Sequence, residues 1–209
     1  MTETLSYMAS HADLFWEATV EHAALVGTTL AISILLAAGL TLACLGSNRL
    51  GDAVVEVLGA LYSIPSIALF ALLIPLTGLG ETSAVAVMVL YCQFILVRNA
   101  LEGLRGVDPA VLEAARGIGM TPAQSLLLVR LPLAAPTIVA GVRMAAISCV
   151  GIATVAAAIN AGGLGAILFS GLRTLNVPKI LGGTACCVAL ALAFDAALRL
   201  VESRLRVRG

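Results

Sequence analysis

Long apolar stretches with few charges alternate with shorter polar connections along this chain. An α-helix rises about 1.5 Å per residue, so about 20 apolar residues are needed to cross the hydrocarbon core of a membrane. Five stretches come close to that length: residues 23–45, 53–76, 83–101, 133–158 and 181–201. The pattern therefore predicts an all-α integral membrane protein with about five transmembrane helices.

The composition supports the same class of protein. The chain is 60% hydrophobic and only 11% charged, with a mean hydropathy of +1.06, whereas soluble domains carry about 25% charged residues. A water-soluble fold of this length cannot bury so much apolar surface. The formal net charge is zero, so the sequence lacks the basic balance of a nucleic-acid-binding protein, and we expect no nucleic-acid partner.

The positions of Lys and Arg predict how the chain is oriented, because cytoplasmic connections carry an excess of both residues. With the N-terminus outside and the C-terminus inside, only Arg173 and Lys179 of the 12 cations fall on the outer side. The cations on or near the cytoplasmic side are then Arg49, Arg98, Arg105, Arg116, Arg130, Arg143, Arg199, Arg204, Arg206 and Arg208. The long connection between the third and fourth spans is therefore expected in the cytoplasm.

The two ends of the chain differ in charge from the apolar centre. We expect an acidic N-terminal tail over residues 1–22, one transmembrane domain over residues 23–203 and a basic cytoplasmic tail over residues 204–209. The N-terminal tail lacks the positive charge of a signal peptide. Phe15 and Trp16 suit an anchor at the membrane interface, but a solvated acidic tail fits the residues equally well.

A polar segment from about residue 102 to residue 132 interrupts the apolar pattern. Asp108-Pro109 suits a helix start, because Asp caps free N–H groups and Pro fits the first turn. That helix is expected to end at Gly117 or Gly119, and Thr121-Pro122 to open another. We expect Pro132 to mark a bend into the fourth span. Docking of a cytoplasmic partner and an amphipathic helix on the membrane surface both explain this segment.

Two further irregular stretches lie in or beside the predicted spans. Ser63, Pro65 and Ser66 are expected to break the second span, either along a transport pathway or as a tolerated kink. The outer connection, residues 159–180, holds Asn160, Gly162 and Gly163 before a short apolar helix. That re-entrant or surface helix suits an external gate, and a lid packed over the bundle is the alternative.

Charged residues inside the spans predict specific contacts. A charge at the bilayer centre costs about 2.5–3.5 kcal/mol on insertion scales. Glu56 lies near a span end, where its side chain can reach water. Arg143 and Asp195 lie deeper, so we expect Arg143 to face protein or a wet cavity, with Asp195 as its partner.

The polar segment contains a spaced pattern that resembles a known family. The matching residues are Glu113, Ala114, Ala115, Gly119, Val129, Leu131 and Pro132. They resemble the EAA loop of ABC importer permeases, the binding-protein-dependent transporters of type I fold, with Val129 in place of the usual Ile. The stretches 64–80, 97–120 and 160–172 resemble the osmoprotectant branch of these permeases.

The resemblance implies a permease subunit that forms, as a dimer, the membrane pathway for an osmoprotectant such as glycine betaine, choline or carnitine. It also implies a cytoplasmic ATPase dimer, a second permease subunit, identical or paralogous, an external substrate-binding protein, and a location in the bacterial plasma (inner) membrane. The EAA loop is similar to the coupling helix that contacts the ATPase. The residues expected to couple are Glu113, Ala114, Ala115, Gly117, Gly119, Met120, Thr121 and Pro122.

The chain itself lacks the sequence of an ATPase or another enzyme. A phosphate-binding loop needs the pattern G-x-x-x-x-G-K-[ST], and Lys179, the only Lys, follows Pro178 instead. His11 and His22 lack metal-ligand spacing, so we expect no catalytic, cofactor or metal site here, with ATP and Mg²⁺ held by the partner ATPase. An ABC permease for another small solute, such as an amino acid, and an ion-gradient-driven carrier are the alternatives.

Substrate recognition has only weak sequence support. Quaternary ammonium groups are commonly bound by aromatic cages, yet aromatic residues make up 4% of the chain. Tyr62, Tyr91 and Gln93 are candidate contacts, although each also suits a core or interfacial role. We therefore expect selectivity to reside mainly in the external binding protein.

Overall fold

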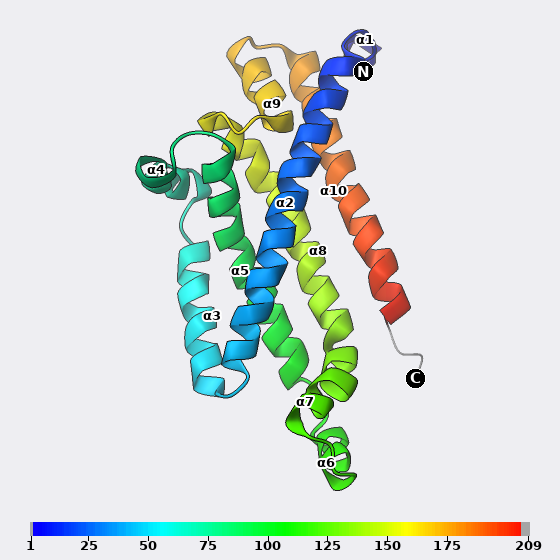
Figure 1. The fold of residues 1–209 in the computed structure, drawn as a ribbon. Coiled ribbons are helices and arrows are strands. Elements are labelled where there is room, and N and C mark those ends of the chain that lie inside the picture. Colours follow the sequence, from blue (N-terminus) through cyan, green and yellow to red (C-terminus); the bar gives the residue numbers. More distant parts are fainter. Residues whose placement is uncertain (1, 206–209) are drawn as a thin grey trace.

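Every regular element of the structure, a computed structural model that describes residues 2–205, is a helix (Figure 1). The α-helices are α1 (Thr2–Ser10), α2 (Ala12–Cys44), α3 (Asn48–Tyr62), α4 (Ser66–Thr77), α5 (Glu81–Arg105), α6 (Pro109–Gly117), α7 (Pro122–Ser125), α8 (Leu131–Ala156), α9 (Gly163–Arg173) and α10 (Val177–Leu205). A π-helical turn, Leu126–Arg130, precedes α8, and a 3₁₀ turn, Ala157–Ile159, follows it. The all-α prediction is confirmed.

Four continuous helices are long and apolar enough to cross a membrane. They are α2, α5, the joined helix Pro122–Ile159 and α10. The predicted second span is instead two helices, α3 and α4, bent by 95° at the break between them. Counting that pair as one broken span gives the predicted five.

The first membrane helix begins earlier than the hydrophobic pattern predicts. Helix α2 starts at Ala12, so the second half of the predicted acidic tail is part of a 33-residue helix. Phe15 is only 5% exposed and packs in a cluster with Leu164 and Ile167 of α9. Trp16, by contrast, is 70% exposed. The predicted basic tail lies mostly outside the described residues, which end at residue 205.

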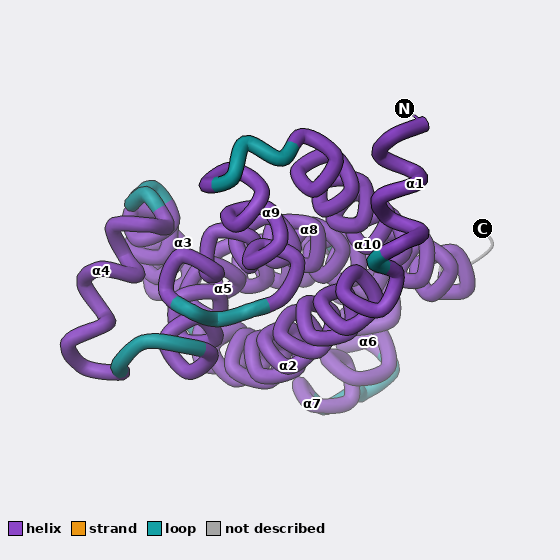
Figure 2. Tube along the Cα trace, turned by 90° about the horizontal axis from the view of Figure 1, so that it is seen from above, coloured by secondary structure: helices purple, strands orange, loops and turns teal. Residues whose placement is uncertain are grey.

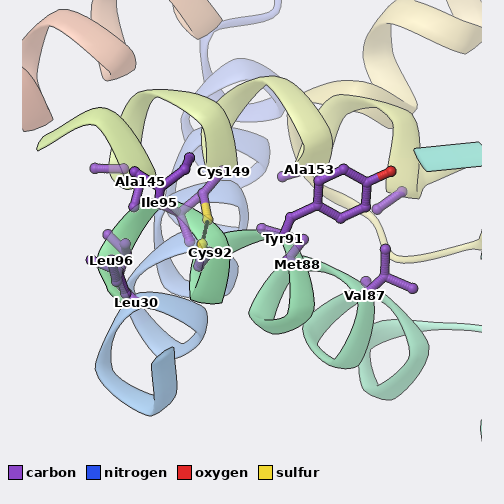
Figure 3. Close-up of a cluster of buried hydrophobic side chains, with 14 of the residues drawn as sticks. Leu30, Val87, Met88, Tyr91, Cys92, Ile95, Leu96, Ala145, Cys149 and Ala153 are labelled. Carbon is purple, nitrogen blue, oxygen red and sulfur yellow. Dashed lines mark hydrogen bonds between the residues drawn. The ribbon is translucent and has the colours of Figure 1, made fainter. Parts of the chain in front are cut away.

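Helix α5 forms the centre of the bundle and packs against α8, α2 and α3. Figure 3 shows Met88, Tyr91, Cys92 and Ile95 of α5 facing α8. The sulfur atoms of Cys92 and Cys149 lie 2.9 Å apart in this interface. Small residues of α8 allow the two backbones to approach closely, as is common between membrane helices.

The short elements gather at opposite ends of the bundle (Figure 1). Helices α6 and α7 project from one end, beside the turn between α2 and α3. Helices α1, α4 and α9 lie at the other end. Figure 2 shows α4 and α10 on opposite sides of the α5–α8 pair. We use the name elbow for residues 106–130, which carry α6, α7 and the π-helical turn.

Candidate functional site

The elbow begins with a helix whose two ends are both capped. Asp108 accepts a hydrogen bond from the Ala110 N–H at 2.8 Å, and Pro109 occupies the first turn. At the other end, Gly119 has a φ of +80°. This left-handed residue lets the Met120 N–H reach the Ala115 carbonyl at 3.1 Å, the closure typical of a helix that ends in glycine. Helix α6 therefore lies where the sequence predicted it.

The second elbow helix also starts at its predicted residues. Thr121 and Gln124 form a reciprocal capping box, with Thr121 N–H donating to Gln124 Oε1 at 2.9 Å. The expected bend at Pro132, however, is wrong. Helix α7, the π-helical turn and α8 form one continuous helix, Pro122–Ile159, with Pro132 inside it. The π-helical turn Leu126–Arg130 lies directly before Pro132, and such a local change of hydrogen bonding allows a membrane helix to continue through a proline.

The surface of the elbow at the end of α6 carries small residues with open space around them. Glu113, Ala114, Gly117 and Gly119 are exposed, and of the EAA triplet only Ala115 is buried, at 5% exposure. A Cβ atom added at Gly117 or Gly119 would meet no atom within 4 Å. The small side chains here therefore do not make room for another part of this chain. They leave an open surface.

A large apolar side chain is exposed at the end of α6. Ile118 is 75% exposed between the two glycines, and the sequence analysis did not select it. In the sequence, Ile118 could have been recognised as a large aliphatic residue between two glycines. Single exposed aliphatic side chains are common on proteins, so Ile118 supports a partner contact only together with the open glycines on either side of it.

The break between α3 and α4 is held by a residue from α5. The Tyr91 hydroxyl donates to the carbonyl of Ile64, which lies between the two helices. Tyr62 packs against Tyr91 with ring centroids 5.4 Å apart. Both tyrosines therefore have a structural role at the break. Of the residues predicted for the break, Ser63 and Pro65 are exposed and Ser66 is half-buried.

The outer connection turns sharply between α8 and α9. We call residues 160–162 the α8–α9 loop. Asn160, Gly162 and Gly163 all have left-handed backbones, with φ of 65°, 75° and 67°. The Gly163 N–H donates to Glu21 Oε2 of α2 at 2.7 Å. This contact was missed from the sequence, because Glu21 was assigned to the N-terminal tail.

The charged residues within the spans lie together at the contact between α8 and α10. Arg143 Nη2 is 2.7 Å from Asp195 Oδ1, and Arg143 Nη1 is 2.5 Å from Glu202 Oε2. Arg199 Nη2 bonds the other oxygen of Asp195 at 2.8 Å. The structure thus brings the predicted pair together and adds Glu202 and Arg199, two residues the sequence analysis did not assign to it.

The family comparison covers most of the chain. Residues 25–207 match the model of the binding-protein-dependent transport system inner membrane component. The choline transport system permease protein OpuBB of Bacillus subtilis (strain 168) is 35% identical over 191 residues, 91% of this chain and 88% of that protein. The osmoprotectant import permease protein OsmW of Salmonella typhimurium (strain LT2) is 34% identical, over 99% of both chains.

Solved structures share the fold at lower sequence identity. An inward-facing structure of the MetNI methionine ABC transporter matches 95% of this chain and 99% of its own, with a TM-score of 0.87 and 21% identity. An amino acid ABC transporter crystallised with histidines gives a TM-score of 0.80 at 19% identity, over 95% of this chain and 97% of its own. The chain therefore belongs to the family of binding-protein-dependent transport system inner membrane components, the multi-pass permeases of ABC importers in the bacterial plasma membrane.

Proposed function

We propose that this chain is the permease subunit of an osmoprotectant importer, with glycine betaine, choline or carnitine as substrate. Two permease subunits of this kind, identical or paralogous, form the pathway through the membrane. The support is the function of its relatives. Besides the choline and osmoprotectant permeases, the glycine betaine/carnitine/choline permease OpuCB of Bacillus subtilis is 31% identical over all of this chain and 96% of that protein.

The elbow is the surface that docks on the cytoplasmic ATPase. The observation that carries this assignment is the open C-terminal end of α6, where a Cβ atom at Gly117 or Gly119 would meet nothing within 4 Å and Ile118 is 75% exposed. An open surface of small residues with an exposed aliphatic side chain suits a groove on another protein, into which the helix can fit closely. Glu113 is exposed beside it and can accept charge-assisted hydrogen bonds from a basic partner.

Energy for transport comes from the partner subunit rather than from this chain. Transport requires work, and the sequence has no phosphate-binding loop that could bind ATP through a Lys. ATP and Mg²⁺ therefore bind in the ATPase dimer, and the capped helices of the elbow transmit the motion to α8 through the continuous helix Pro122–Ile159. An external binding protein delivers the substrate.

The end of the bundle opposite the elbow contains the external gate. The α3–α4 break and the α8–α9 loop supply its irregular backbone, which membranes tolerate only inside protein or beside water. Helix α4 and helix α9 both lie at this end (Figure 1). The gate residues are Ser63, Pro65, Ser66, Asn160, Gly162 and Gly163.

Uptake into reconstituted vesicles tests this function. The permease, its ATPase and its binding protein are reconstituted together, and uptake of labelled glycine betaine, choline and carnitine is measured with and without ATP. We expect uptake of at least one of these osmolytes. The uptake should require ATP on the side of the vesicle membrane where the ATPase is bound. Competition by unlabelled amino acids alone would favour an amino-acid permease. Uptake driven by a proton or sodium gradient without ATP would overturn the proposal.

A further inference from the structure

Helix α2 is tied to the first residue of α9 by a carboxylate. The Glu21 Oε2 atom accepts a hydrogen bond from the Gly163 N–H at 2.7 Å. The first N–H groups of a helix have no partner within the helix, and an anionic acceptor also interacts favourably with the helix dipole there. Glu21 itself is exposed, so it is not required to fill the core.

The neighbouring residue fixes the same loop from inside the bundle. His22 is fully buried, and its Nε2 atom lies 3.1 Å from the carbonyl oxygen of Val150 in α8. Because a carbonyl only accepts, Nε2 carries the proton and donates. His22 therefore connects α2 to α8 close to the place where Glu21 connects α2 to α9.

The two glycines of the turn fit closely against this pair. A Cβ atom at Gly162 would lie 2.1 Å from Glu21 Oε1, and one at Gly163 would lie 2.9 Å from His22 Nδ1. Both glycines also have positive φ, which other residues rarely adopt. The α8–α9 loop is thus shaped to lie directly on Glu21 and His22.

We propose that Glu21 is a positioning residue for transport, which holds the α8–α9 loop and the start of α9 against α2, beside the buried His22. This inference rests on the proposed function, since it gives the N-terminal part of α2 a role in the external gate. The Glu21 carboxylate fixes the start of α9 through its hydrogen bond to the Gly163 N–H. The buried His22 ring lies directly beside Gly163 and supports the loop by packing.

Substitution at Glu21 separates this role from general stability. Glu21→Ala removes the acceptor, and Glu21→Gln keeps an acceptor oxygen at the same reach but removes the charge. Glu17→Ala is the matched control, because Glu17 is an exposed glutamate one turn earlier on the same helix. The complete transporter in lipid nanodiscs and in vesicles is used for all variants.

Two readouts are measured: amide hydrogen exchange over residues 160–166 and the kinetics of ATP-driven uptake. We expect Glu21→Ala to speed exchange of this segment about tenfold, as expected for loss of one charge-assisted hydrogen bond. We also expect it to lower the maximal uptake rate about tenfold while KM changes by less than about twofold. Glu21→Gln should recover part of both losses, and Glu17→Ala should match wild type.

Other outcomes overturn the proposal in distinct ways. If Glu21→Ala and Glu17→Ala show equal exchange, Glu21 does not hold the loop. If exchange rises but uptake is unchanged, the contact has no role in transport. If the wild-type complex shows no ATP-driven uptake, the proposed function fails, while the exchange comparison still decides whether Glu21 holds the loop.

Discussion

Arg143 shows how ion pairs in this chain reduce the free-energy cost of placing a charged side chain in a membrane. Its guanidinium bonds Asp195 and Glu202, and Asp195 also bonds Arg199. The cluster of two arginines and two carboxylates is formally neutral, which lowers the cost of placing each charge in or near the bilayer. It joins α8, which continues the elbow, to α10 on the side of the bundle away from α4 (Figure 2).

Removing one member of this cluster should destabilise the protein. Asp195→Asn keeps the size of the side chain but leaves two arginines facing one carboxylate. We expect the melting temperature of the purified permease to fall by several degrees. The control is Glu102→Gln in the exposed pair Arg98–Glu102, where little change is expected. Equal effects at both pairs would contradict this account.

Arg143 and Asp195 of this cluster could be predicted from the sequence. Glu202 and Arg199 could not, for a physical reason. Charges deep in an apolar stretch are costly, so Arg143 and Asp195 could be selected without a structure. Glu202 follows the end of the predicted span, where a charge needs no explanation. Glu21 was missed in the same way, because its partner is a backbone N–H 142 positions along the chain, which no side-chain pattern reveals.

At the scale of elements, the bend between α3 and α4 depends on a donor from a third helix. Pro65 has no N–H and follows Ile64, whose carbonyl accepts from the Tyr91 hydroxyl. A buried carbonyl without a partner costs about 1–3 kcal/mol. The position of α4 is therefore set by α5 as well as by Pro65.

Tyr91→Phe tests the role of this hydroxyl. The substitution keeps the ring packing and removes the donor, so we expect stability to fall by about 1 kcal/mol or more and amide exchange in α4 to increase. Tyr62→Phe is the matched control, since the neighbouring Tyr62 ring packs at the same break. If the two variants exchange equally in α4, the hydroxyl of Tyr91 does not hold the bend.

The contact between α5 and α8 offers a second test at this scale. A Cβ atom at Gly141 would lie 2.6 Å from Asn99 Cβ, whereas one at Gly151 on the same helix would meet nothing within 4 Å. We expect Gly141→Ala to destabilise the permease by about 1–3 kcal/mol through overpacking. Gly151→Ala should be neutral or slightly stabilising. Thermal unfolding in detergent compares the two, and equal melting temperatures would show that the helices do not approach so closely.

Most helices could be predicted from hydrophobic length, but their ends could not. The break at Pro65 was predicted, whereas its 95° angle depends on packing against α5. The start of α2 was missed because Glu17 and Glu21 interrupt the apolar pattern, although Phe15 and His22 on the same helix are buried. The expected bend at Pro132 was wrong because the π-helical turn Leu126–Arg130 lets the helix continue through the proline.

At the scale of the whole molecule, the two ends have different constructions. The elbow end presents a capped, projecting helix pair that continues into α8, and the opposite end presents the broken α3–α4 pair and the α8–α9 loop (Figure 1). The continuous helix Pro122–Ile159 links the two ends. This arrangement suits the transmission of a helix movement from the elbow to the proposed external gate, about one membrane thickness away.

ATP-driven uptake by a Gly117→Trp permease tests the docking role of the elbow most directly. Gly117 is exposed and has no neighbour within 4 Å, so an indole fits the fold but blocks a close partner; Gly46, at the same end of the bundle, is equally open and serves as the control. We predict at least about tenfold slower uptake and loss of ATPase co-purification for Gly117→Trp, with wild-type behaviour for Gly46→Trp. Wild-type uptake and co-purification by Gly117→Trp would contradict the account.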